Sequence, residues 1–174
     1  MDSLKRDYQN KIDFIQSLNQ NPRSEKTEIT KEWKQYFYKI DKLLATYTES
    51  PKYLVNDDVA KIVADSMMYF DKEEYYLSCY CIMSNHVHLV IQLLKNSRTI
   101  DRIMQSIKSY SASKCNELLR RRGQFWQHEN YDHIIRDEAE FERIVQYVLN
   151  NPVKAGLVEK QDDWKWNYLA KLDM

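Results

Sequence analysis

Two histidines one residue apart, His86 and His88, are the side chains of this sequence best placed to do chemistry. They lie in the run 81–92, which is rich in apolar and β-branched residues and so is typical of a β-strand. Side chains alternate between the two faces of a strand, so both imidazoles point one way, and Val87, Leu89 and Ile91 point the other way, into a core. The pair is a candidate site for a divalent cation; the alternative is two surface histidines on a half-exposed strand.

Tyr147 and Asn151 are a second candidate pair. The spacing of apolar residues predicts a helix from Asp137 through Asn150, with a buried stripe of Phe141, Ile144, Val145 and Val148. On a wheel of about 100° per residue centred on Phe141, Tyr147 falls just outside this stripe, and Asn151 lies one turn further along. A phenol beside an amide and two imidazoles is a candidate nucleophile next to a metal. A boundary tyrosine with its hydroxyl in water is the alternative.

A basic segment runs from Lys95 to Gln127 and carries six positive charges in excess, although the 174-residue chain is neutral overall. It is predicted to be a long helix from Arg98 to Arg122, closed by Gly123 as a C-terminal cap. Such a helix is a candidate phosphate-binding face; the alternative is an ordinary solvated helix side. The candidate DNA-binding residues are Arg98, Arg102, Lys108, Lys114, Arg120, Arg121, Arg122 and, for base stacking, Trp126.

The remaining pattern predicts the elements that position these side chains. Residues 75–83 and 86–94 alternate as the two strands of a hairpin, and a helix begins at Asp57 or Asp58. Residues 1–50 are charged and follow a helical pattern, with stripes at Ile12, Ile15 and Leu18 and then at Trp33, Phe37, Ile40 and Leu44. An aromatic tail of Trp164, Trp166 and Tyr168 is expected to pack back on the domain. These elements suit one domain over residues 1–174, in which 1–50 is a helical N-terminal segment.

Composition excludes several classes of protein. Three cysteines complete no zinc-binding pattern and indicate reduced thiols in a cytosolic protein. The chain has no signal peptide and no apolar run long enough to span a membrane, so no membrane partner is expected.

Four motifs, in order, resemble one family. Met83-Ser-Asn-His-Val-His-Leu-Val90 is similar to the signature of the single-tyrosine HUH transposases. Three further segments resemble the REP-associated branch of that family: Gly123-Gln-Phe-Trp-Gln127, Tyr131-Asp-His-Ile-Ile-Arg-Asp137 and Tyr147-Val-Leu-Asn-Asn-Pro-Val-Lys-Ala-Gly-Leu-Val158. The resemblance covers about Pro51 to Tyr168.

The resemblance implies an α+β fold with a ferredoxin-like antiparallel sheet and packed helices. It implies a single-stranded DNA endonuclease and strand transferase, in which His86, His88 and Asn151 bind Mg²⁺ or Mn²⁺ and Tyr147 is the nucleophile. Imidazoles by themselves also suit zinc. The implied partner is single-stranded or hairpin DNA, bound by a monomer or a homodimer.

The sequence departs from the family in two places. Ser84 stands where the family has a proline, and the family's first strand would end where this chain begins. The second departure predicts a sheet that lacks one strand, as in a truncated copy or one with a misassigned start. Three functions therefore stay open: an active DNA-cleaving transposase, a binding-only relic that recognises hairpins, and a zinc hydrolase with His133 as a third ligand.

Overall fold

The computed structural model of this chain describes residues 51–128 and 130–171, together with residues 6, 8–14, 29, 32, 35, 36, 38, 39 and 42–44. The chain divides into two compact units, Met1–Ser50 and Pro51–Met174. None of the described helices has the length and hydropathy needed to cross a membrane.

The first unit is helical where it is described. Residues 8–14 form a helix, and the described residues between 32 and 44 are helical as well. Tyr8 and Tyr36 stack with ring centroids 4.3 Å apart, and Lys11 pairs with Glu32 at 2.9 Å, so these two segments pack against each other. Ile12 is buried, as its helical spacing predicts. The predicted stripe residues Ile15, Leu18, Trp33, Phe37 and Ile40 lie outside the described residues.

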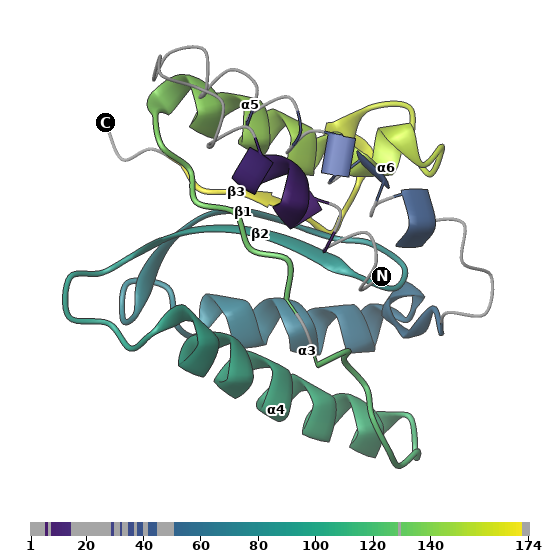
Figure 1. The fold of residues 1–174 in the computed structure, drawn as a ribbon. Coiled ribbons are helices and arrows are strands. Elements are labelled where there is room, and N and C mark those ends of the chain that lie inside the picture. The colour runs from purple at the N-terminus through teal and green to yellow at the C-terminus, as the bar shows by residue number, and fades with distance from the viewer. Residues whose placement is uncertain are drawn as a thin grey trace. The chain divides into compact units, whose positions relative to one another are not determined.

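The second unit is an α+β fold of three layers, which confirms the expected fold class (Figure 1). A three-stranded antiparallel sheet in the order β2-β1-β3 is covered by α3 and α4 on one face and by α5 on the other. Its elements are η1 (Tyr53–Val55), α3 (Asp57–Met68), β1 (Tyr75–Ile82), β2 (Val87–Leu93), α4 (Ile100–Leu118), α5 (Glu138–Leu149), α6 (Asn151–Lys154), η2 (Gln161–Asp163) and β3 (Asn167–Leu169).

The sheet has two different faces because its side chains alternate. Leu77, Tyr80 and Ile82 of β1 join the apolar core with α3 and α4. The opposite face carries Cys81, which lies between His88 of β2 and Asn167 of β3 in the register. The predicted hairpin is confirmed. Among the described residues, β2 is paired only on its β1 side, so it forms one edge of the sheet.

The aromatic tail packs back on the domain, as expected, and it also supplies a strand. Tyr168 pairs with Tyr80 in the sheet and stacks on its ring at 5.2 Å. The indole of Trp164 donates to the carbonyl of Ile82 at 3.0 Å, and that of Trp166 donates to Asp57. The sequence prediction missed β3.

α4 is shorter than predicted and ends differently. It stops at Leu118, and the residue that turns the chain out of the helix is Arg120, with φ +50°. The N–H of Arg120 donates to Glu117 and that of Arg121 to Asn116, which is the Schellman pattern of helix termination. Gly123 was therefore wrongly predicted as the cap. Leu118, the last residue of the helix, is exposed, whereas Cys115 about one turn earlier is buried.

We expect Arg120→Gly to stabilise the second unit by about 0.5–1 kcal/mol. A side chain in the left-handed region costs about 1–2 kcal/mol, and part of the gain is offset because glycine loses more backbone entropy on folding. The measurement is the midpoint of urea denaturation. Arg122→Gly is the matched control, since Arg122 is also exposed but has no positive φ, and it should not stabilise. Equal effects of the two changes would contradict the role of Arg120 as a strained cap.

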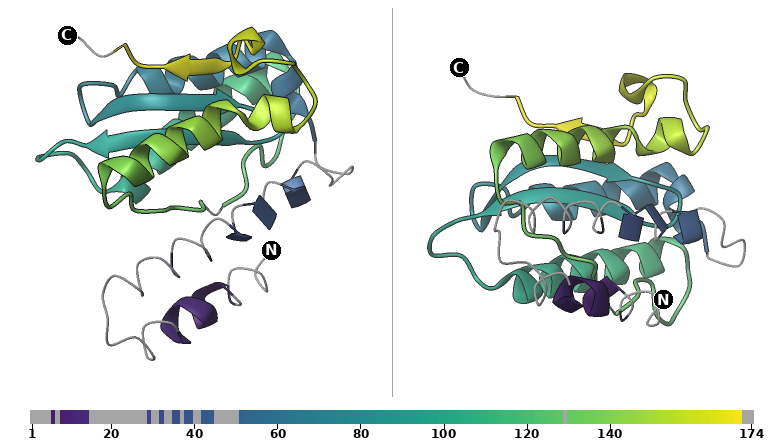
Figure 2. Two further views of the ribbon diagram at one scale, coloured as in Figure 1. Left: turned by 90° about the horizontal axis from the view of Figure 1, so that it is seen from above. Right: turned by 45° about the horizontal axis from the view of Figure 1, so that its top comes forward.

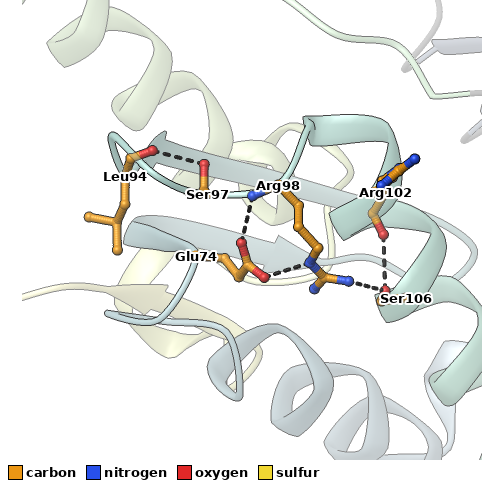
Figure 3. A network of polar contacts seen from close by, with 6 residues as sticks. All are labelled: Glu74, Leu94, Ser97, Arg98, Arg102 and Ser106. Carbon is orange, nitrogen blue, oxygen red and sulfur yellow. Dashed lines mark hydrogen bonds and ion pairs between the residues drawn. The ribbon is translucent and has the colours of Figure 1, made fainter.

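The beginning of α4 is fixed by a polar network (Figure 3). Glu74, at the end of the turn before β1, accepts from the backbone N–H of Arg98 at 2.9 Å and from its Nε at 2.5 Å. The guanidinium of Arg98 also donates to Ser106 at 3.0 Å. The two hydrogen bonds that Glu74 accepts from Arg98 lower the pKa of its carboxyl group. The bond from the backbone N–H has the larger effect, and the bond from the guanidinium has the smaller one.

This lowered pKa predicts a stability contribution that depends on pH. A carboxylate with a depressed pKa stabilises the fold above its ordinary pKa and loses that effect as the pH falls through its folded value. Glu74→Gln should therefore lower Tm at neutral pH, and its difference from the unmodified chain should shrink below a pH of about 4. Glu73→Gln, one residue away and outside the network, is the control. If the difference in Tm between Glu74→Gln and the unmodified chain stays the same at acidic pH, the ion pair is not its cause.

Candidate active site and nucleic-acid interface

The hairpin loop positions the two histidines. Residues 83–86 form the loop, closed by the N–H of Met83 donating to the carbonyl of His86 at 2.9 Å. The rings of His86 and His88 lie on one face with centroids 5.0 Å apart and planes at 86°. The side-chain oxygen of Asn85 accepts from Nδ1 of His86 at 2.8 Å. A protonated Nδ1 leaves the Nε2 lone pair of His86 for a ligand.

His88 is electrically neutral at physiological pH. Burial lowers its pKa to about 4, and the positive charge of Lys154 adds to this effect. Its Nε2 and that of His86 are both shielded from solvent. A neutral imidazole is the form that binds metals, so His88 can present a ligand nitrogen beside Nε2 of His86 on the α5 side of the sheet.

α5 lies across β1 and β2, on the face that carries the histidines (Figure 2). As predicted, the helix begins after Asp137. The carboxylate of Asp137 caps the helix by accepting from the N–H of Glu140 at 2.8 Å. Ile144, Val145 and Val148 are buried, which confirms most of the predicted stripe.

Phe141 was wrongly placed at the centre of that stripe. It is 37% exposed, whereas Glu140 is 3% exposed. A carboxylate tolerates this position because it accepts from the N–H of Arg136 at 2.7 Å and contacts His133 Nε2 at 3.0 Å. Burial alone would raise the pKa of Glu140, but these two partners hold it below its usual value. Burial lowers the pKa of His133, and Glu140 only partly offsets this.

The end of α5 brings the tyrosine to the histidines. The ring of Tyr147 lies 6.3 Å from that of His88, edge to face. Asn151, buried at the start of α6, donates from Nδ2 to the carbonyl of Tyr147 at 3.0 Å. Lys154 places its ammonium 3.7 Å from the centroid of the Tyr147 ring. His86, His88, Tyr147 and Asn151 thus come together from two segments far apart in the sequence.

The donor set fits a divalent cation. It consists of two imidazole nitrogens and one amide oxygen, which are suitable ligands and leave coordination positions for substrate oxygens. Within the described part of the chain, no three histidine, cysteine or acidic side chains gather as a metal site. His133 is held by Glu140 instead. The hypothesis of a zinc site with His133 as third ligand is therefore wrong.

The predicted basic residues lie elsewhere. α4 covers the sheet face opposite to α5, so the basic helix and the tyrosine are separated by the sheet (Figure 1). On α4 and in the residues just after it, four of the predicted basic side chains are exposed: Arg102, Lys114, Arg120 and Arg122. Lys114 forms an ion pair with Glu117 at 3.1 Å.

Several of these predicted DNA-binding residues make internal contacts. Arg98 holds Glu74. Arg121 donates to Asn116 and Gln124 and covers the ring of Tyr53 at 4.5 Å. Lys108 donates to the carbonyls of Gln127 and His128 at 2.9 and 3.3 Å, and the indole of Trp126 donates to Ser111 at 2.9 Å. Their predicted contacts with DNA stay predictions.

Three residues of the site were missed from the sequence. Asn85 orients His86, Glu140 anchors the segment before α5, and Lys154 covers Tyr147. The spacing Asp137-x-x-Glu140 is a capping pattern that indicates Glu140. Lys154 is seven residues after Tyr147, two helical turns on, but Pro152 between them argues against a continuous helix.

Comparisons with known proteins agree with this geometry. A family model described as Transposase IS200 like matches residues 27–151, starting before the region covered by the four motifs. A Haemophilus influenzae protein provisionally named REP-associated tyrosine transposase is 28% identical over 96 residues, covering 50% of this chain and 54% of its own length. An uncharacterized protein of the same species is 29% identical over 98 residues, covering 42% and 52%. The chain thus spans about half the length of these curated relatives.

A solved structure of a REP-associated tyrosine transposase bound to a REP hairpin has a similar fold. Its TM-score is 0.59 at 18% sequence identity, over 69% of each chain. The likeness supports the sheet and helix arrangement described above. Because the family model spans most of the sequence, including both histidines and Tyr147, the chain belongs to the IS200-like transposase family.

Proposed function

We propose that this chain is a single-stranded DNA endonuclease and strand transferase that acts through a 5′-phosphotyrosine at Tyr147. The observation that carries the proposal is the position of Tyr147: its ring lies 6.3 Å from one of two adjacent imidazoles, and its backbone carbonyl accepts from Asn151. Family membership supports the same reaction class.

In the proposed step, the phenolic oxygen of Tyr147 attacks the scissile phosphorus and gives its proton to solvent. The bond from phosphorus to the 3′ oxygen breaks, and that oxygen leaves as a 3′-hydroxyl after taking up a proton. One phosphodiester is exchanged for another, so attack by a 3′-hydroxyl on the phosphotyrosine reverses the step and joins strands without a nucleotide cofactor.

The chain's own residues position the reactants. His86, His88 and Asn151 would hold Mg²⁺ or Mn²⁺, with Asn85 fixing the His86 ring and α5 fixing Tyr147. When bound, the cation would neutralise charge on the phosphate during transfer. The helix C-terminus sets the phenol beside the phosphate position, which lowers the entropic barrier to attack.

The proposed substrate is a DNA hairpin with a single-stranded flank. The structural neighbour is bound to a REP hairpin, and the exposed side chains of Arg102 on α4 and of Arg120 and Arg122 just after it offer cations for DNA phosphates. Because α4 and Tyr147 lie on opposite faces of the sheet, the proposal assigns the hairpin and the cleaved strand to different surfaces.

The competing proposal is binding without cleavage. It is favoured by the position of β2, which carries His88 and forms a sheet edge within the described residues. An edge strand is held on one side only, and its imidazoles are then less firmly oriented.

The test is covalent capture of DNA. Labelled hairpin oligonucleotides with single-stranded flanks are incubated with the protein and Mn²⁺, Mg²⁺ or EDTA, and adducts are resolved on denaturing gels. We expect an adduct with a divalent ion and none in EDTA. Hairpins that the protein binds but to which it never becomes covalently attached would favour the binding-only proposal. An adduct yield that is undiminished in EDTA would remove the metal from the mechanism.

A further inference from the structure

Lys154 is a charged residue in direct contact with the proposed nucleophile. Its ammonium lies over the face of the Tyr147 ring, 3.7 Å from the centroid, within the range of cation–π attraction. An ammonium in this position is only a few ångströms from the phenolic oxygen at the ring's edge. It is also close enough to His88 for its charge to act on that ring.

The backbone that carries Lys154 is firmly fixed. α6 begins with Asn151, bonded to the carbonyl of Tyr147, and with the fully buried Pro152. It ends in a second Schellman pattern, in which the N–H of Gly156 donates to Val153 and that of Leu157 to Pro152, both at 2.9 Å. Here the left-handed residue is a glycine, Gly156 with φ +69°, so the turn is unstrained.

Neither His88, which burial keeps neutral, nor the amide of Asn151 brings a positive charge to the site. The neutral imidazole of His88, the amide of Asn151 and the aromatic ring of Tyr147 lie on this face, and Lys154 supplies a full positive charge among them. Lys154 is exposed at the surface, so an incoming phosphate can reach its ammonium. A phosphodiester brings one negative charge and gains more at its oxygens during transfer, which a fixed neighbouring cation stabilises.

We propose that Lys154 binds the phosphate that Tyr147 attacks, contacting a non-bridging oxygen with its ammonium while its stem and charge hold the phenol ring in place. This inference rests on the proposed function and adds a phosphate-binding residue to it. Lys154 takes no part in bond making: the phenolic proton still goes to solvent and the 3′ oxygen still takes up its own.

A binding experiment tests the phosphate contact without relying on cleavage. Tyr147→Phe keeps the ring and forms no adduct, so affinity for hairpins with single-stranded flanks can be measured by fluorescence anisotropy at several salt concentrations. Adding Lys154→Met, which keeps the length of the side chain and loses its charge, should weaken binding roughly tenfold. It should flatten the slope of log affinity against log salt by about 0.7, the value for one contact to a single strand.

The matched control is Lys72→Met in the same background. Lys72 is exposed in the turn before β1, at the opposite end of the hairpin from His86, and its loss changes net charge equally. Lys154→Arg should retain the affinity and the slope. If Lys154→Met and Lys72→Met have the same slope as the parent, the inference is overturned and Lys154 only packs on the ring.

Single-turnover adduct formation with Tyr147 intact separates this inference from the proposed function. We expect Lys154→Met to slow attachment at saturating DNA by tenfold or more and Lys154→Arg to restore most of the rate. Normal attachment by Lys154→Met would overturn the inference and leave the proposed function standing. If the unmodified chain forms no adduct, the proposed function fails, and the salt slope alone then decides whether Lys154 contacts a phosphate.

Discussion

Tyr147→Phe is expected to eliminate the covalent DNA adduct while leaving the protein folded and able to bind hairpins. The change removes one oxygen, and the ring keeps its contacts with His88 and with Lys154. We expect the free energy of unfolding to change by less than about 0.5 kcal/mol, since Tyr147 is only half-buried and the ring is retained. The measurements are adduct yield on denaturing gels, hairpin affinity and Tm on the same preparations.

Tyr131→Phe is the matched control. Tyr131 is also half-buried and lies in the segment before α5, close in sequence to His133, but it is not in a helix and has no amide one turn away. The control should form the adduct at the normal rate. If Tyr147→Phe still becomes attached and Tyr131→Phe does not, the nucleophile is Tyr131; if both variants become attached, the tyrosine mechanism is wrong.

Much of the fold follows from sequence periodicity. The hairpin is predictable because β1 and β2 alternate around a short polar loop, and α3 and α5 begin at polar caps, Asn56 and Asp137, each followed by an apolar stripe. β3 was missed although Trp164, Trp166 and Tyr168 have the period of two that is typical of a strand. Three paired residues, recruited to the sheet by a long-range contact with β1, are too few to produce a strong local signal.

The errors have a common cause, because tertiary contacts override local preference. Glycine adopts the left-handed conformation of a helix cap more readily than arginine does, yet the chain turns at Arg120 and not at Gly123. The turn at Arg120 lets the next residue, Arg121, donate to Asn116 and cover the ring of Tyr53. Phe141 is the most apolar residue near the start of α5, yet the buried position belongs to Glu140 because His133 and Arg136 satisfy its carboxylate.

In the candidate site, too, the sequence pattern predicts local neighbours, whereas contacts between distant segments depend on the fold. The i, i+2 spacing of the histidines predicts their shared face, and the helical spacing predicts that Tyr147 and Asn151 are neighbours. Only the fold brings the histidines of the hairpin and Tyr147 of α5 together on one face of the sheet. The position of α4 on the opposite face of the sheet is also known only from the fold, because a run of basic residues does not predict which face its helix will cover.

Replacing both His86 and His88 with alanine is the second large expected effect. The double variant should form the DNA adduct at least a hundredfold more slowly, since the lost cation contributes several kcal/mol to the stabilisation of charge in the transition state. Titration calorimetry with Mn²⁺ gives a readout independent of activity: the unmodified chain should bind the ion and the double variant should not. Hairpin affinity in EDTA should be similar for the two, because the exposed cations of α4 are untouched.

His128→Ala controls for the loss of an imidazole as such. His128 is exposed in the loop after α4, and its backbone carbonyl rather than its ring contacts Lys108, so this variant should keep both Mn²⁺ binding and adduct formation. Lost Mn²⁺ binding together with normal adduct formation in the double variant would mean that the cation is bound but not used in catalysis. Retained Mn²⁺ binding would place the cation elsewhere. In that case the two imidazoles, shielded from solvent beside Tyr147, would serve the reaction other than as metal ligands, and the slower adduct formation of the double variant would come from their loss and not from loss of the ion.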